Sequence, residues 1–284
     1  MTRFEDKICR VMTRKEKPKF CTNLPVTGGT LLKNGNVALA SYGKRKVSIF
    51  RLTGQKIRDY KIQNPWDVAA RLDCVAGELL FVSVLKSEKR SARIDQINLS
   101  EENRITTFTR NVVSPCGIAF TLNNELCVCE KKSCKLVIFG EDGGIIREII
   151  NTNFICPWYI AAKSHDELLL SDFYACCVWH LNSSGEIIEK FDKTSESDPT
   201  QFHPAKSVYS DRKIFISDQD GGKVRILSQT GQVRTVIARL DPHEDNFCPV
   251  ILLADDNGHL IIVSKNGEVF VMQIPTEDMK IKIF

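Results

Sequence analysis

Cysteine and histidine are the residues of this 284-residue sequence whose chemistry depends most on spacing, and there are eleven cysteines and five histidines. Cys127 and Cys129 form a C-x-C pair and Cys176 and Cys177 are adjacent, but no C-x-x-C pair occurs. Structural zinc sites normally combine two pairs of closely spaced ligands. The spacing therefore predicts small buried thiols in a reducing compartment, the cytoplasm, and no metal site.

Lysine and arginine are concentrated in three short segments, 44–46, 86–90 and 131–135, and aromatic residues recur near several prolines. Cations hold phosphate groups, and aromatic rings stack on unpaired bases. The combination indicates a site for single-stranded RNA. The candidate RNA-binding residues are Tyr42, Lys44, Arg45, Lys46, Asn64, Trp66, Lys86, Lys89, Arg90, Lys131, Lys132, Lys135, Phe154, Trp158, Tyr159, Tyr174, Phe202, His203 and Phe247.

An internal repeat predicts the elements that must position these residues. A proline followed by a short apolar run recurs six times, about every 45 residues, a period typical of propellers and other repeat proteins. The anchor prolines are Pro25, Pro65, Pro115, Pro157, Pro204 and Pro249. Each unit contains four short β-rich runs separated by polar or glycine turns, and none reads as a long amphipathic helix. Six units of four antiparallel strands predict an all-β, six-bladed β-propeller.

Closure of the ring determines how the domain is divided. We expect one domain over 1–284, with blades at about 21–62, 63–110, 111–152, 153–195, 196–240 and 241–284. An open array would leave two sheet edges exposed, so the N-terminal segment 1–20 is expected to pack against the last blade. Within it, 7–12 resembles a strand, and the last unit is expected to end in the run 279–284.

The loops of a propeller emerge on two opposite faces. The loops between second and third strands, together with those between blades, are expected on one face, here called the top. Over the first three blades these loops carry a net positive charge, whereas the third-to-fourth-strand loops are net negative. The net charge of +4 therefore conceals two unlike faces. A basic and aromatic top face is the electrostatic pattern that phosphate backbones bind.

Catalysis is the main alternative, because six-bladed propellers also include hydrolases and lyases with chemistry at the central channel. The expected inner strands are apolar, and only Asp67 and His203 are well-placed ionisable groups. No H-E-x-x-H, P-loop or G-x-G-x-x-G pattern occurs. We therefore expect the domain itself not to be an enzyme and to hold no metal or other cofactor.

Composition is consistent with a folded domain: 43% of the residues are hydrophobic and 26% are charged. No apolar run reaches the roughly eighteen residues of a membrane span, and the N-terminus lacks the apolar segment of a signal peptide. We expect no membrane partner.

The repeat resembles the NHL repeat, most closely that of the C-terminal propellers of tripartite-motif (TRIM-NHL) proteins. The best matches are the segment Asn64 to Ala69 and the pair Ser217-Asp218 followed by Lys223 to Leu227. The resemblance spans about residue 20 to the end, with blade two the poorest copy. It implies a face that binds RNA or protein partners, and a role in regulating mRNA after transcription.

Two kinds of ligand remain open from the residues alone. The cation cluster favours single-stranded RNA bound over blades one to three. A near-neutral second half, and the use of aromatic anchors in protein interfaces, favour a protein partner. In that alternative the chain recruits substrates or partners for a ubiquitin-ligase-type tripartite-motif protein.

Overall fold

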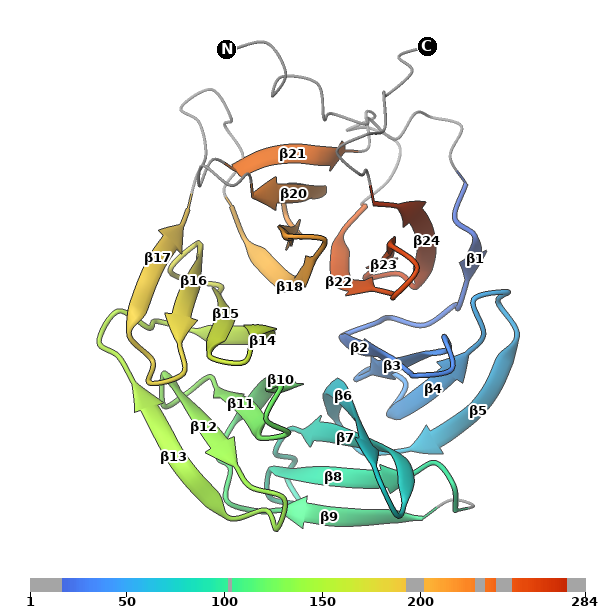
Figure 1. Cartoon of the computed structure of the whole chain (residues 1–284). Coiled ribbons are helices and arrows are strands. Elements are labelled where there is room, and N and C mark those ends of the chain that lie inside the picture. The colour runs from blue at the N-terminus through green and yellow to red at the C-terminus, as the bar shows by residue number, and fades with distance from the viewer. Residues whose placement is uncertain (1–16, 102–103, 193–201, 228–232, 239–246, 275–284) are drawn as a thin grey trace, which may run out of the picture.

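The computed structural model describes residues 17–101, 104–192, 202–227 and 247–274, together with the backbone of 233–238. These residues form twenty-four strands and no helix. The strands make six four-stranded antiparallel sheets arranged around a central axis (Figure 1). The predicted all-β, six-bladed propeller is confirmed.

The strands of each blade run in chain order from the central axis to the rim. They are β2 (Gly28–Leu31), β3 (Val37–Ser41), β4 (Lys46–Phe50), β5 (Lys56–Lys61); β6 (Pro65–Asp73), β7 (Gly77–Val84), β8 (Arg93–Asn98), β9 (Ile105–Thr109); β10 (Pro115–Phe120), β11 (Leu126–Glu130), β12 (Lys135–Phe139), β13 (Ile145–Ile150); β14 (Pro157–Ser164), β15 (Glu167–Asp172), β16 (Cys177–Asn182), β17 (Ile187–Phe191); β18 (Pro204–Ser210), β19 (Lys213–Asp218), β20 (Lys223–Leu227), β21 (Val233–Ala238); and β22 (Pro249–Ala254), β23 (His259–Ser264), β24 (Glu268–Gln273).

An N-terminal strand completes the sixth blade. The strand β1 (Phe20–Cys21) pairs antiparallel with β24, with Phe20 opposite Val269, so the sheet order is β1-β24-β23-β22. Pairing the two ends of the chain covers the edge that β24 would otherwise expose. The segments 7–12 and 279–284, which we expected to be strands, lie outside the described residues.

Burial follows the position of each strand in its blade. The second strands, such as Val37–Ser41 and Leu126–Glu130, are buried throughout, because neighbouring blades cover both of their faces. The outermost strands, such as Ile145–Ile150, alternate and are largely exposed. The apolar core therefore lies between successive blades, as in stacked sheets whose inner faces interdigitate.

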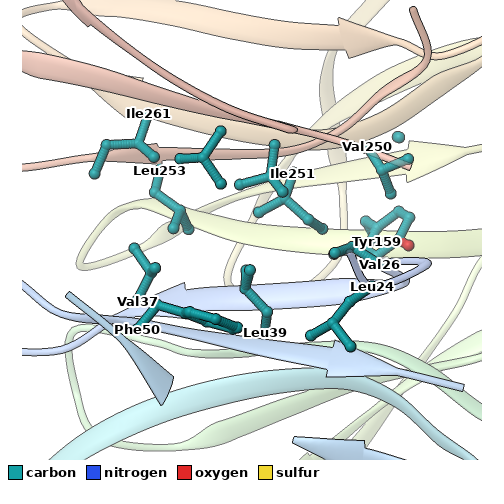
Figure 2. Packing of buried hydrophobic residues seen from close by; sticks show 13 residues of the cluster. Leu24, Val26, Val37, Leu39, Phe50, Tyr159, Val250, Ile251, Leu253 and Ile261 are labelled. Atoms are coloured by element: carbon teal, nitrogen blue, oxygen red, sulfur yellow. The ribbon is translucent and has the colours of Figure 1, made fainter. Parts of the chain in front are cut away.

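Side chains from several blades fill the central axis. Tyr159 of blade four is 1% exposed, and its hydroxyl donates a hydrogen bond to the carbonyl of Thr27 in blade one. It packs in the cluster at the seam of blades six and one, beside Val26 and Val250 (Figure 2). At Gly28, an added Cβ atom would lie 2.3 Å from the Cα atom of Asp67, so the inner strands approach as closely as glycine allows.

A buried ion pair also crosses the axis. Asp67 of β6 is fully buried, and its Oδ1 lies 3.2 Å from Nζ of Lys206 in β18. The same carboxylate accepts hydrogen bonds from the backbone N–H groups of Gly29, Val68 and Ile118. Asp67 thereby ties blades one, two, three and five together, whereas Lys206 was not singled out from the sequence.

Candidate nucleic-acid interface

The second-to-third-strand loops of blades one, three and four share one turn. In these turns, the fourth residue has a positive φ, at Arg45, Cys134 and Cys176. The first residue of each turn is Tyr42, Lys131 or Phe173, and all three lean over an indole ring near the axis: Tyr42 over Trp66, and the other two over Trp158. The repeated backbone turn therefore places three different side chains, from blades one, three and four, in contact with Trp66 or Trp158.

The residues that follow the anchor prolines form the inner wall of the top face. Trp66 and Trp158 follow the prolines of blades two and four, whereas blade three has the small Cys116 at this position. The two indole rings lie 5.3 Å apart between centroids, nearly perpendicular at 88°. Because Cys116 fills less space than the indoles beside it, a cavity of about 320 Å³ remains, lined by Trp66, Leu85, Lys86, Val113, Ser114, Cys116, Lys131, Lys132 and Trp158.

Lys131 and Phe173 both contact the ring system of Trp158. The ammonium group of Lys131 lies 4.1 Å from one ring centroid, a cation–π contact. Phe173 is tilted by 33° against the indole at 5.3 Å. His203 stacks in turn on Phe173 at 4.6 Å, and its Nδ1 is 2.6 Å from Oδ2 of Asp220.

A groove leads outward from this cavity over blades one and two. It has a volume of about 950 Å³ and is lined by Tyr42, Arg45, Gln63, Asn64, Lys86, Ser87, Glu88, Lys89, Arg90 and Lys132. It shares Lys86 and Lys132 with the aromatic cavity. A further cavity of about 630 Å³ at the rim of blade two shares Lys89 and Arg90 with the groove and adds Lys61 and Arg110. The three hollows form one surface, here called the basic track, from the rim to the two tryptophans.

The cations of the two faces differ in their partners. On the face opposite the track, guanidinium and ammonium groups lie against carboxylates, as in the contact of Arg147 with Glu125 at 2.9 Å and that of Lys163 with Glu167 at 2.7 Å. Among the cations that line the track, Arg93 is paired with Asp95 at 2.7 Å. Within the described residues, the other eight form no ion pair; these are Arg45, Lys61, Lys86, Lys89, Arg90, Arg110, Lys131 and Lys132. The track therefore presents positive charge that the described carboxylates leave uncompensated.

Ten of the predicted residues line the track. They are Tyr42, Arg45, Asn64, Trp66, Lys86, Lys89, Arg90, Lys131, Lys132 and Trp158. Asn64, with a φ of 53°, accepts a hydrogen bond from the backbone of Leu85 and holds the base of the groove. Lys44 and Tyr174 are exposed in the top loops without lining one of these hollows.

Four predicted aromatic residues are buried instead of exposed, and we correct their placement. Phe154, Phe202 and Phe247 precede the anchor prolines and pack between blades, with 2–5% of their surface accessible. Val112 takes the same place before blade three. An apolar residue just before the proline is thus a repeated packing position, and Tyr159 is buried at the axis.

Three predicted polar residues are also engaged by the protein itself. Lys46 and Lys135 begin third strands, and their ammonium groups contact Asp59 at 2.9 Å and Glu148 at 2.6 Å on the adjacent fourth strands. Their charge is therefore largely compensated. The imidazole of His203 lies between Phe173 and Asp220, where it supports the aromatic stack.

Several residues that line the track were not among those predicted from the sequence. Lys61 and Arg110 stand at or just after the ends of the fourth strands of blades one and two, before the interblade loops. Aligning the units by these strand ends places them on the top face. Leu85, Val113 and Cys116 supply the apolar wall between the tryptophans. The residue type after each anchor proline is the signal that reveals this cavity.

The cysteines show no metal arrangement: within the described ranges, no three cysteine, histidine, aspartate or glutamate side chains cluster as ligands. Burial raises the pKa of the Cys116 and Cys177 thiols to about 12. At neutral pH such thiols are protonated, and nucleophilic or metal-binding chemistry needs the thiolate. Among the described residues there is also no helix with the length and apolar character needed to cross a membrane.

Comparisons with known proteins give the fold. No family model and no curated protein matches the sequence. A streptogramin B lyase structure matches with a TM-score of 0.63 and 12% identity over 88% of this chain and 94% of that chain. Virginiamycin B lyase from Staphylococcus aureus matches with a TM-score of 0.61 and 16% identity, over 92% of this chain and 87% of that chain. The PQQ-bound aldose sugar dehydrogenase from Streptomyces coelicolor matches with a TM-score of 0.64 and 11% identity, over 90% of this chain and 95% of that chain.

These similarities correct one expectation. Lyases and a dehydrogenase occur among the solved propellers that this chain resembles, so the prediction that the domain is not an enzyme, made from its apolar inner strands and missing motifs, is wrong. At 11–16% identity the likeness shows the fold alone, and it assigns no reaction to this chain. The resemblance to the TRIM-NHL family is likewise reduced to a six-bladed propeller.

Proposed function

We propose that the chain binds short single-stranded RNA along the basic track. The observation that carries the proposal is the continuity of the track: uncompensated cations extend from the rim of blade two to a cavity between Trp66 and Trp158. A flexible strand with its phosphates on the cations and a base at the indole rings matches this order.

The shape of the track favours a single strand over a duplex. A single strand exposes its base faces, and each stacked base is worth about 1–3 kcal/mol. In a duplex the bases are already stacked on one another, so a recessed aromatic cavity finds only phosphates and groove edges. The small volume between the indole rings, about 320 Å³, lies at the lower end of the range for small-molecule pockets.

The resemblance to NHL propellers agrees with this proposal but does not carry it, because no family model matches the sequence. Regulation of mRNA after transcription, in the cytoplasm, is the biological setting we propose for such binding. A protein partner is the competing ligand, and its signature is an outcome of the test described next.

Salt dependence of binding is the first test. For single strands, log K falls with log salt at a slope of about −0.7 per phosphate contact. The groove alone contributes five cations, so we expect a slope of about −3.5, or roughly a hundredfold weaker binding between 50 and 200 mM salt. Fluorescence anisotropy of a labelled ten-nucleotide RNA of random sequence measures this slope.

Two double variants with the same change in charge then locate the site. Lys86→Glu with Lys132→Glu acts where the groove meets the aromatic cavity. Lys33→Glu with Arg51→Glu acts on exposed cations of loops on the opposite face. We expect the first to abolish measurable binding and the second to change affinity less than twofold. Equal effects of the two variants, or an acidic peptide that competes with RNA at the same affinity and slope, would overturn the RNA proposal.

A further inference from the structure

We infer that Trp158 is a stacking site for one nucleobase and that Lys131 covers this site until RNA arrives. The inference deepens the proposed function and rests on it. It concerns the inner end of the track, where the Lys131 ammonium lies 4.1 Å from the Trp158 ring centroid. A base stacked on that indole must displace the ammonium group from it.

Trp158 is held firmly enough to serve as a stacking platform. Phe173 packs against it at 5.3 Å, His203 stacks on Phe173 at 4.6 Å, and Asp220 lies 2.6 Å from the imidazole. The centroid of Trp66 lies 5.3 Å from that of Trp158, at 88° to it. A side chain held by two aromatic neighbours, Phe173 and Trp66, loses little rotamer freedom when a ligand binds, and this favours tight stacking.

The walls around Trp158 suit a flat heterocycle with polar edges. Leu85, Val113 and Cys116 are apolar, and Lys86 and Lys132 stand at the rim. Nε1 of Trp66 is buried and has no hydrogen-bond partner among the described residues. Burying a donor without an acceptor is unfavourable.

Lys131 has two uses for its charge in this arrangement. Without RNA the ammonium group rests on the indole face, which is its best nearby partner in the described structure. When a base takes that face, the phosphate of the same nucleotide offers a stronger partner, because both groups are fully charged. A neutral nucleoside displaces Lys131 without this compensation, so the cover discriminates against ligands that lack phosphate.

Two matched alanine variants test the cover. Lys131→Ala and Lys132→Ala each remove one cation from the cavity wall, and each is expected to make the salt slope for RNA less steep by about 0.7. Only Lys131→Ala exposes the indole face. It is expected to bind adenosine about threefold to tenfold more tightly than the unaltered protein, the fold-range of a cation–π contact. Quenching of tryptophan fluorescence by adenosine measures this affinity, and identical adenosine affinities in the two variants would overturn the cover.

The stacking site itself is tested with RNA that carries 2-aminopurine at one position at a time. We expect one position to change its fluorescence on binding, and Trp158→Leu to remove that change and weaken RNA binding about fivefold to a hundredfold. Tyr174→Leu is the matched control, since that ring is 64% exposed outside the cavity.

The outcomes separate the inference from the function beneath it. RNA binding that responds to the Lys86 and Lys132 charge reversals but equally to Trp158→Leu and Tyr174→Leu refutes the stacking site and leaves the proposed function standing. RNA binding that ignores those charge reversals refutes the proposed function, whatever the tryptophan variants show.

Discussion

Replacing Asp67 by alanine tests whether the closed axis holds the blades together. The carboxylate is fully buried and accepts three backbone hydrogen bonds, at 2.8 Å from Val68 and 3.1 Å from both Gly29 and Ile118. It also contacts the ammonium group of Lys206 at 3.2 Å. The Asp67→Ala variant leaves all four donors without this acceptor.

The expected cost follows from those contacts. Removing one partner of a buried ion pair costs about 3–5 kcal/mol, because the other charge stays buried. Each buried N–H group without an acceptor costs about 1–3 kcal/mol. Water entering the space of the lost carboxylate brings both contributions to their lower ends, about 3 kcal/mol for the ion pair and about 1 kcal/mol for each of the three N–H groups, so we expect Asp67→Ala to lower the free energy of unfolding by about 6 kcal/mol. Whole domains have only about 5–15 kcal/mol.

Urea unfolding followed by tryptophan fluorescence measures this loss. Lys206→Met alone leaves the carboxylate with its three N–H donors, and we expect a smaller loss, of about 2–3 kcal/mol. The double variant is expected to be more stable than the sum of the single losses by about 1–3 kcal/mol, since no charge remains uncompensated. Asp166→Ala, at an exposed position, is the control that leaves the urea midpoint unchanged. A loss below about 1 kcal/mol for Asp67→Ala, or strict additivity, refutes the assigned role.

Two further predictions concern thiols and acid. Because burial raises the pKa of Cys116 and Cys177 to about 12, iodoacetamide at pH 8 should alkylate the exposed Cys74 and spare both, as read by peptide mass spectrometry; equal labelling contradicts this. Burial raises the pKa of Asp59, but hydrogen bonds from Ser48, Lys46 and Lys56 outweigh it and hold that pKa below its ordinary value. The stabilisation is present above pH about 4 and is lost as pH falls through the lowered pKa. Asp59→Asn should therefore be less stable than the unaltered protein at pH 7, with the difference shrinking at pH 3 in urea unfolding, and a constant difference contradicts it.

The fold was predictable because the sequence repeats the same pattern, a proline followed by an apolar strand, six times. Five of the six anchor prolines open an inner strand, as Pro65 opens β6 and Pro157 opens β14, whereas Pro25 precedes β2 by three residues. Six weak signals at one period reinforce one another. The closing strand was harder to locate. The strand β1 consists only of Phe20 and Cys21, which is too short for an alternation of apolar and polar residues to predict a strand. Its register depends on β24, near the other end of the chain.

The site was predictable only in part, since loop position does not determine side-chain direction. Phe154 and Trp158 lie four residues apart around the same proline, yet one packs between blades and the other faces the top cavity. Lys46 and Lys131 both belong to second-to-third-strand loops by position, but Lys46 pairs with Asp59 across a strand. Such pairing depends on register between strands, which charge counting over loops does not include.

The basic track reaches from blade one to Trp158 of blade four, and its cations on blades one and two stand above neutral residues at one position in the second strand. The residue opposite the anchor proline is Glu130, Asp172 or Asp218 in blades three to five, Val84 in blade two and Ser264 in blade six. These three acids are buried and accept hydrogen bonds from the interblade backbone. They also place negative charge beneath the top loops of their own blades.

Blades one and two have no acid at this position. In blade two the interblade backbone is held by Asn64 and Leu85, and in blade one the Ser41 hydroxyl donates to the carbonyl of Pro25. Neutral groups thus hold the interblade backbone in place of the acids. The positive field of the cations above them is not weakened by a buried carboxylate acting through a medium of low dielectric. In blades one and two the ring therefore closes without a buried negative charge beneath the track cations of these blades.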